Sequence, residues 1–300
     1  MLIVKYRKIF YALTTLLILA SIGSIAIFGL NFGIDFTGGT IVEFSYEGDV
    51  PTKERIDTQL GGLGMGEHSL RASGESGFIL RTPELSEEAR QDMIEALAFD
   101  GEFEVLQERV NTIGPVIGNE LKNKALVAIV IVVFAIILFV AFAFRKVSEP
   151  VSSWKYGLIA IFALLHDILI PVGVFALLGH YVGSEVNVLF VTALLAILGY
   201  SVNDTIVVFD RVRENLKQNR DLHRKEDFEL TVGKSLTQTY TRSVNTSLTT
   251  AFALLTLFFI GAPATQDFAL VLLVGIIAGT YSSIALATPL LVTWAGKEVK

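Results

Sequence analysis

The chain of 300 residues is unusually apolar, because 52% of its residues are hydrophobic, only 18% are charged and its mean hydropathy is +0.58. Soluble domains contain about 45 to 50% apolar residues, so a soluble monomer could not bury this much apolar surface. The net charge of −6 gives none of the basic surplus with which nucleic-acid-binding domains neutralise phosphates, and the lack of cysteine excludes disulfides, thiolate metal sites and a cysteine nucleophile.

Six apolar segments are long enough to cross a bilayer, whose hydrocarbon core of about 30 Å needs about 20 helical residues. Their continuous hydrophobicity predicts helices rather than barrel strands. The first segment is too long for a signal peptide and no A-x-A cleavage site follows it, so we expect an uncleaved anchor. The predicted spans cover residues 9–30, 125–144, 156–178, 188–209, 244–260 and 268–294.

The distribution of Lys and Arg predicts that both termini are cytoplasmic, since cytoplasmic flanks carry the excess of basic residues. With the N-terminus inside, 16 of the 24 basic residues lie on the inner side, and the short outer loops at 179–187 and 261–267 contain none. The predicted organisation is a cytoplasmic N-terminus with the first helix (1–30), an extracytoplasmic domain (31–122), five further helices (123–296) with a cytoplasmic loop at 210–243, and a cytoplasmic tail (297–300).

The polar segment between the first two spans is predicted to fold as a ferredoxin-like α+β domain. Its predicted elements are a strand (41–46), a helix that begins at Thr52, a hairpin (68–72 and 78–82), a helix capped by Ser86 and a last strand (103–110). The order βαββαβ is that of a split βαβ domain. This fold specifies no chemistry by itself, and a binding or spacer module without an active site is the simplest interpretation.

Ionisable residues inside the predicted spans are the best candidates for function. A charge in hydrocarbon costs about 2.5 to 3.5 kcal/mol on insertion scales unless it faces a partner or water. Asp204, preceded by Asn203, lies deep in the fourth span, and helical spacing places Tyr200, Asp204 and Val208 on one face with Ser201 beside them. We expect Asp204 to carry a proton or an ion, and the alternative is a structural hydrogen bond between helices.

A second titratable pair, His166 and Asp167, lies near the middle of the third span. Adjacent helical residues point about 100° apart, so we expect the two side chains not to share one face, and structural packing and a relay role are both open. The four histidines of the chain are scattered without the spacing of metal ligands, so no metal site is expected, and no cofactor is expected either.

The fifth span is entered by a basic residue followed by hydroxyl-bearing side chains. Helical spacing places Arg242, Thr246 and Thr249 or Thr250 along one face. An arginine at a cytoplasmic helix entry is usually an anchor, and hydroxyls are common where membrane helices pack closely. On this pattern alone, a purely structural role is the leading interpretation.

Five motifs spread over almost the whole chain resemble the SecF family of protein-export membrane proteins, which work with SecD beside the bacterial Sec translocon. The motifs are GLNFGIDFTGG (29–39), IGPVIGNEL (113–121), LLHD (164–167), GYSVNDTIVVFDRVREN (199–215) and TRSVNTSLTT (241–250). The resemblance implies six helices of the resistance-nodulation-division transporter type with a ferredoxin-like extracytoplasmic domain.

The resemblance also implies a function that needs no enzymatic step: use of the proton-motive force to promote protein export on the outer side of the bacterial inner membrane. In the family, the aspartate and the arginine of the last two motifs are essential to proton conduction, and they correspond to Asp204 and Arg242, although Ser243 stands where many relatives have Thr. Expected partners are a SecD-like chain, because this chain holds one six-helix unit, the Sec translocon with its SecY-type channel, an insertase, preproteins and membrane lipid.

The segment from Asn31 to Gly39 is expected to couple the outer domain to the first helix. Its residues Gly33, Asp35, Gly38 and Gly39 belong to the first motif, and Gly38 and Gly39 permit backbone geometry that other residues rarely adopt.

Two other functions remain as alternatives. A small-molecule or lipid exporter of the same superfamily would use the same carboxylate but would need an aromatic-lined substrate pocket in its outer portion. A non-conducting scaffold of the translocon would use Asp204 only as a hydrogen-bonding group. The coupling ion is left open between H⁺ and Na⁺.

Overall fold

The structure, a computed structural model, describes residues 2–66, 68–144 and 152–295. Arg145 and Lys146, which contributed to the predicted orientation, and the predicted tail at 297–300 lie outside the described residues. The described chain divides into two compact units. The helical unit comprises residues 2–31, 127–144, 152–184 and 189–295, and the α+β unit comprises residues 32–66, 68–126 and 185–188.

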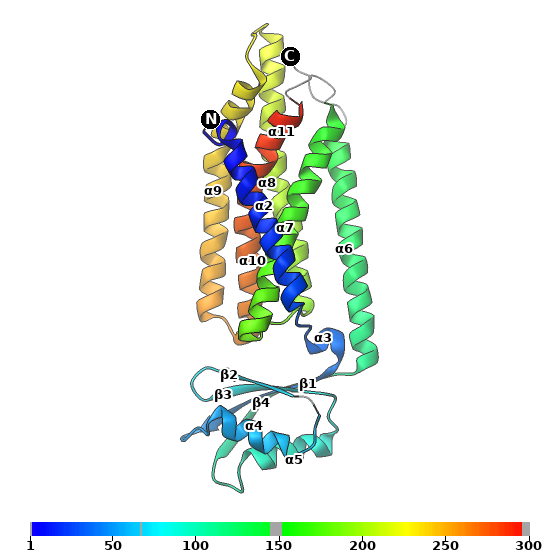
Figure 1. Cartoon of the computed structure of the whole chain (residues 1–300), viewed down its shortest axis with the longest axis vertical. Coiled ribbons are helices and arrows are strands. Elements are labelled where there is room, and N and C mark those ends of the chain that lie inside the picture. The colour runs from blue at the N-terminus through cyan, green and yellow to red at the C-terminus, as the bar shows by residue number, and fades with distance from the viewer. Residues whose placement is uncertain (1, 67, 145–151, 296–300) are drawn as a thin grey trace. The chain divides into compact units, whose positions relative to one another are not determined.

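Six helices in the described chain are long and apolar enough to cross a membrane, which confirms the predicted number of spans. Five of the spans correspond to α2 (Arg7–Phe28), α6 (Pro115–Phe144), α7 (Ser153–Val182), α8 (Val188–Asp221) and α9 (Phe228–Ile260), and the sixth contains α10 (Pro263–Tyr281) and α11 (Thr288–Ala295). The short helix α1 (Leu2–Lys5) precedes α2. In the helical unit, α7 packs against α2 and α10, and α10 packs against α9 (Figure 1).

The sixth span is not one regular helix. A π-helical segment, η1 (Ser282–Ala287), separates α10 from α11, and all six of its residues are buried. A π-helical turn widens the backbone and is frequent at functional sites. Hydropathy could not reveal it, because the segment is as apolar as the helices on either side.

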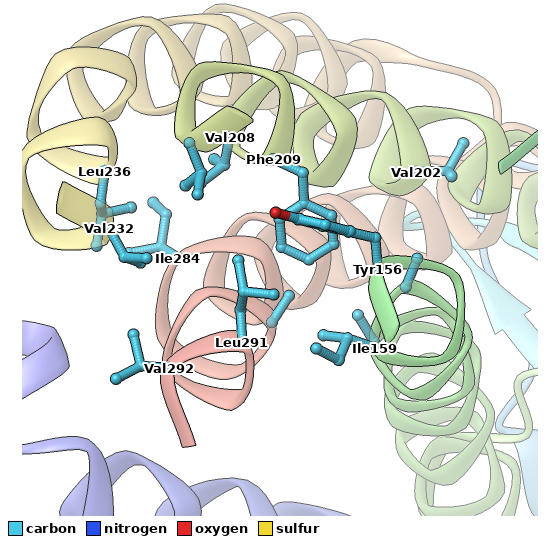
Figure 2. Close-up of a cluster of buried hydrophobic side chains, with 14 of the residues drawn as sticks. Tyr156, Ile159, Val202, Val208, Phe209, Val232, Leu236, Ile284, Leu291 and Val292 are labelled. Atoms are coloured by element: carbon cyan, nitrogen blue, oxygen red, sulfur yellow. The ribbon is translucent and has the colours of Figure 1, made fainter. Parts of the chain in front are cut away.

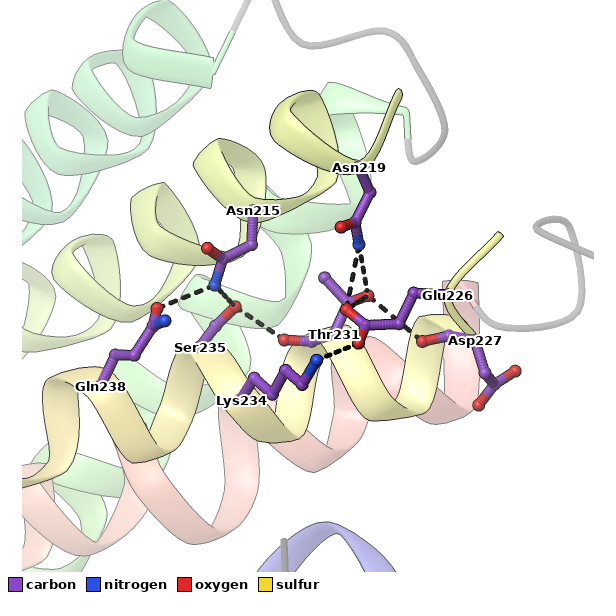
Figure 3. A network of polar contacts seen from close by, with 8 residues as sticks. All are labelled: Asn215, Asn219, Glu226, Asp227, Thr231, Lys234, Ser235 and Gln238. Carbon is purple, nitrogen blue, oxygen red and sulfur yellow. Dashed lines mark hydrogen bonds and ion pairs between the residues drawn. The ribbon is translucent and has the colours of Figure 1, made fainter. Parts of the chain in front are cut away.

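The segment 210–243, predicted as a cytoplasmic loop, is largely helical. Helix α8 continues to Asp221 and α9 begins at Phe228, so a short connection joins two long helices. Polar side chains join the two extensions (Figure 3): Asn215 donates to Ser235 at 2.8 Å, and Asn219 donates to Glu226 at 3.1 Å. A further hydrogen bond from Lys234 helps to lower the pKa of the Glu226 carboxyl. These hydrogen bonds between side chains hold the two helical extensions together.

The core of the helical unit lies where α7, α8, α9, η1 and α11 meet (Figure 2). Tyr156 and Phe209 pack edge to face there, with ring centroids 5.2 Å apart, and both are fully buried. The surrounding side chains are aliphatic: Ile159, Val202, Val208, Val232, Leu236, Ile284, Leu291 and Val292. This packing fixes the rotation of α8 about its axis, and therefore the direction in which its polar side chains point.

The α+β unit has the predicted ferredoxin-like arrangement. Its strands are β1 (Gly39–Glu47), β2 (Ser69–Ser73), β3 (Gly77–Thr82) and β4 (Glu104–Ile113), and its helices are the short α3 (Ile34–Thr37), α4 (Lys53–Gly61) and α5 (Glu87–Leu97). The sheet order is β2-β3-β1-β4 with antiparallel neighbours, as a split βαβ domain requires. Thr52 and Ser86 cap α4 and α5 by accepting the N–H groups of Arg55 and Ala89.

Alternate residues of β1 face the two helices and form the core of this unit. Phe44 and Leu80 of the sheet, Leu60 of α4 and Met93 of α5 are at most 1% exposed. Figure 1 shows α4 and α5 on the same side of the sheet. A sheet with one face covered by two helices is a complete hydrophobic core.

This core predicts that a fragment of residues 38–114 folds alone. Leu80→Ala should lower its free energy of unfolding by about 2 to 5 kcal/mol, because the side chain is fully buried. Leu63→Ala is the matched control: Leu63 is 37% exposed, so the change should stay within about 0.5 kcal/mol. Urea unfolding followed by circular dichroism measures both. A fragment without a cooperative transition would contradict the assignment of a separate core.

Candidate functional site

Asp204 is held inside the helical unit with only part of its hydrogen-bonding capacity used. The residue is 6% exposed, and its Oδ1 accepts a hydrogen bond of 2.9 Å from Ser243 Oγ of α9. Its Oδ2 is buried and has no hydrogen-bond partner within the described residues. Buried polar atoms in native structures are nearly always paired with protein or water. The second carboxylate oxygen is therefore open to a proton, a water molecule or an ion.

A cavity of about 290 Å³ lies against this carboxylate. Its walls come from α8 and α9: Tyr200, Asn203, Asp204, Val207, Arg242, Thr246, Thr249 and Thr250. Asn203, Arg242 and Thr249 are exposed, so the cavity reaches the surface of the helical unit. The predicted polar face of α9 and the carboxylate of α8 thus meet in one place.

Arg242 shares the cavity with Asp204, but within the described residues the carboxylate accepts a hydrogen bond from Ser243 and none from Arg242. Arg242 also lines a second cavity of about 150 Å³, together with Asp210 and Glu214 near the extended end of α8. The guanidinium therefore stands in both spaces, one containing the buried carboxylate and the other lined by exposed acidic residues. Small movements of α9 against α8 would change its distance to either.

Ser243 is the residue of this site that sequence reasoning did not assign. It is fully buried and donates directly to Asp204, whereas Thr246 and Thr249 donate their hydroxyl hydrogens to carbonyls of their own helix. The only signal was its position one residue after Arg242, on a different face from the predicted stripe. When a hydroxyl donates to a charged carboxylate, the hydrogen bond is charge-assisted and stronger than one between neutral groups.

The predicted polar stripe of α8 is only partly correct. Tyr200, Asn203 and Asp204 line the cavity, but Val208 is fully buried in the hydrophobic core. Ser201 points to another partner, Asp167 of α7.

His166 and Asp167 form a separate buried network. Contrary to the expectation from their angular separation, His166 Nδ1 and Asp167 Oδ1 are 2.8 Å apart, because both side chains bend toward each other along α7. Asp167 Oδ2 also accepts from Ser201 and, at 2.8 Å, from Ser282 of η1. Thr205 of α8 and Ser283 of η1 bond at 2.8 Å. This network joins α7, α8 and η1 without reaching the cavity of Asp204.

The predicted coupling segment lies in the α+β unit, where its glycines are needed for close packing. Gly38 and Gly39 have positive φ angles of 76° and 131°, and a Cβ would come within 2.8 Å of Pro115 Cα and 2.6 Å of Thr82 O, respectively. Gly33 donates its N–H to Val186 O at 3.0 Å, and Asp35 Oδ2 accepts the N–H of Val188 at 2.9 Å. The contacts of Gly33 and Asp35 are thus made with the connection between α7 and α8.

No group of three or more His, Cys, Asp or Glu side chains is arranged to hold a metal ion within the described residues. The distinctive chemical feature of the site is a buried carboxylate with one oxygen that has no hydrogen-bond partner among the described residues.

Comparisons with known proteins cover almost the whole chain. The family described as "Protein export membrane protein SecD/SecF, C-terminal" matches residues 93–297, and the "SecD/SecF GG Motif" matches residues 23–50. The protein translocase subunit SecF of Thermobaculum terrenum is 42% identical over 99% of this chain and 94% of its own length. The corresponding subunit of Anaerolinea thermophila is 34% identical over 97% and 93%.

This chain matches only one part of a longer relative. The protein translocase subunit SecDF of Thermus thermophilus is 36% identical over 96% of this chain but only 38% of its own length. The crystal structure titled as SecDF, a translocon-associated membrane protein of Thermus thermophilus, superposes with a TM-score of 0.83, covering 97% of this chain and 38% of that chain. Motifs, fold and identity agree: the chain belongs to the SecD/SecF family of protein-export membrane proteins.

Proposed function

We propose that this chain is an accessory subunit of the Sec translocase that uses an ion gradient to promote protein export. Asp204 is the residue that binds and releases the ion. The names of its relatives support the translocase assignment. The single observation that supports ion coupling is the Asp204 carboxylate, buried with one oxygen unpartnered beside a cavity that reaches the surface. No catalytic step on a substrate is part of this function.

The partner is a SecD-like chain. The fused relative from Thermus thermophilus has more than half of its length outside the region that this chain matches. Exposed polar side chains at the cavity, among them Asn203 and Thr249, would be costly against lipid tails, so a partner helix or water has to cover them. The SecD-like chain supplies that cover, and the assembled pair acts beside a SecY-type channel and an insertase.

Proton transfer at this site follows from its two environments. While Ser243 donates to Asp204 and water in the cavity meets the free oxygen, the carboxylate is stabilised in its charged form. When the cavity closes, a charge left without water or Arg242 becomes costly and a proton binds instead. Alternation between the two states favours different helix arrangements, which is how ion flow changes conformation.

The first test is Asp204→Asn, which keeps the shape of the side chain but cannot titrate. We expect assembly with the SecD-like chain at parental abundance and complete loss of the gradient-stimulated part of preprotein release. The measurement is release in membrane vesicles with and without a proton gradient, repeated with a sodium gradient. If Asp204→Asn kept the parental stimulation under the gradient that drives the parent, Asp204 would be a structural group and the chain a non-conducting scaffold.

Ser243 separates the hydrogen bond from the charge. Ser243→Ala should slow gradient-stimulated release by about tenfold, because a hydrogen bond to a charged group contributes about 1.5 to 3 kcal/mol. Ser243→Thr retains the donor and should stay near the parental rate. Equal rates for the two variants would show that the 2.9 Å contact with Asp204 has no part in coupling.

We propose the orientation that the basic residues predict, with both termini cytoplasmic and the α+β unit outside a bacterial inner membrane. The chain has no cysteine, so single cysteines can be introduced at Glu75, exposed in the turn between β2 and β3, and at Lys217, exposed on the α8 extension. In intact cells an impermeant thiol reagent should label position 75 and not position 217. The opposite labelling pattern would reverse the orientation.

A further inference from the structure

Four residues that connect two membrane helices belong by their contacts to the α+β unit. Residues 185–188 follow α7 and lead into α8, yet they group with residues 32–66 and 68–126 rather than with the helical unit. Connections between membrane helices are ordinarily free to move with the helices. Here the connection is held by three separate kinds of interaction, all within the α+β unit.

The first interaction is between backbones. Phe32 and Val186 form a parallel β-bridge, and Gly33 N–H donates to Val186 O at 3.0 Å. The connection is therefore paired like a short strand with the first residues of the GG-motif segment. Backbone pairing fixes its position along that segment as well as its distance.

The second interaction is an ion pair between Arg81 of β3 and Glu185. The side chain of Glu185 is only 7% exposed and that of Arg81 is 24% exposed, so solvent screens the pair weakly. The carboxylate lies against Gly33: a Cβ at this position would stand 2.7 Å from Glu185 Oε2. Gly33 thus leaves room for the carboxylate, and a larger residue at this position would make the Glu185 side chain shift.

The third interaction is at the start of α8. Val188 is the first residue of this helix, and its N–H donates to Asp35 Oδ2 at 2.9 Å. The first N–H groups of a helix have no partner inside it, and an acidic acceptor there is also favoured by the helix dipole. Asp35 is in α3, which precedes β1, so a residue of the α+β unit caps the N-terminus of α8.

We propose that these contacts form a permanent clasp, made of residues 32–35 and Arg81 on one side and residues 185–188 on the other, that makes α8 move together with the α+β unit. Asp204 lies 16 residues beyond Val188, about 24 Å along the same helix at a rise of about 1.5 Å per residue. A displacement of α8 caused by protonation of Asp204 is then delivered to the α+β unit through the clasp. The inference rests on the proposed function, because it assumes that Asp204 drives the movement.

The expected route differs from the one predicted from sequence, in which the GG-motif segment transmits movement to the first helix. Gly38 and Gly39 pack against Pro115 and Thr82 and so shape the α+β unit itself. Gly33 and Asp35 instead hold the connection to α8. Helix α8 is the one that carries Asp204.

Charge reversal tests the ion pair in the full chain, assembled with its SecD-like partner in membrane vesicles. Arg81→Glu and Glu185→Arg should each reduce gradient-stimulated preprotein release by about tenfold or more, since each leaves a weakly screened charge facing a like charge. The double variant Arg81→Glu/Glu185→Arg should recover at least half of the parental release. Arg71→Glu, a reversal at an exposed position of the neighbouring strand β2, is the matched control and should not change release.

Rescue by the double variant would show that the pair itself is needed, whereas a defect of folding would also lower abundance in the single variants. Single reversals that export at the parental level would overturn the clasp. So would a double variant no better than the worse single variant at equal abundance.

A cross-link tests whether the clasp stays closed. Cysteines at Phe32 and Val186, the two residues of the β-bridge, are within the range in which a disulfide can form. Oxidation should join them in resting vesicles, and the oxidised variant should export as well as the same variant after reduction, because a permanent clasp need not open. Oxidation that stops export reversibly, or a pair that cannot be joined, would overturn the inference.

These outcomes can be separated from failure of the proposed function. Asp204→Asn in the same vesicles reports on ion coupling alone, and cross-linking between positions 32 and 186 reports on the clasp without any gradient. Loss of coupling in Asp204→Asn combined with parental release in the single reversals would reject the clasp and retain the function. Parental release in Asp204→Asn would reject the function, and with it the role given to the clasp.

Discussion

The structure depends on one constraint: a carboxylate has to be kept inside a bundle of apolar helices. Asp204 meets this constraint by accepting one hydrogen bond from Ser243 and by leaving its other oxygen beside a cavity. A fully paired carboxylate would be stable but inert, and one without any donor would remain protonated. In the proposed function, the half-satisfied state is what would let the group exchange a proton when its surroundings change.

The rest of the helical unit sets the direction of this side chain. The aliphatic core around Tyr156 and Phe209 packs one side of α8, so the opposite side carries the cavity. The buried network of Asp167, Ser201 and Ser282 joins α7, α8 and η1 one turn away from Asp204. The consecutive serines of η1 reach two different helices: Ser282 bonds to Asp167 of α7 and Ser283 to Thr205 of α8. Asp204 therefore lies on a helix whose position is set by a packed core and a buried hydrogen-bond network.

The α+β unit has its own source of stability. Its own core is complete, so it does not need the helices for its stability. Within this unit, residues 185–188 are held by a backbone bridge, an ion pair and a hydrogen bond to the first N–H of α8. Several weak constraints of different kinds together hold a short connection more firmly than any one of them, because each restricts a different movement.

The sequence alone predicted the six spans and the ferredoxin-like domain and identified Asp204 as a candidate functional residue, because hydropathy, strand alternation and the cost of a charge in lipid are local properties of the chain. Only the tertiary structure decided which side chains meet. Ser243 is 39 positions from Asp204, and Glu185 is more than 100 positions from Arg81, so these pairs depend on how each helix or strand is rotated and packed. The π-helical turn and the helical extensions of α8 and α9 were missed for the same reason: they are stabilised by contacts with distant segments, and their own residues do not distinguish them from regular helix or polar loop.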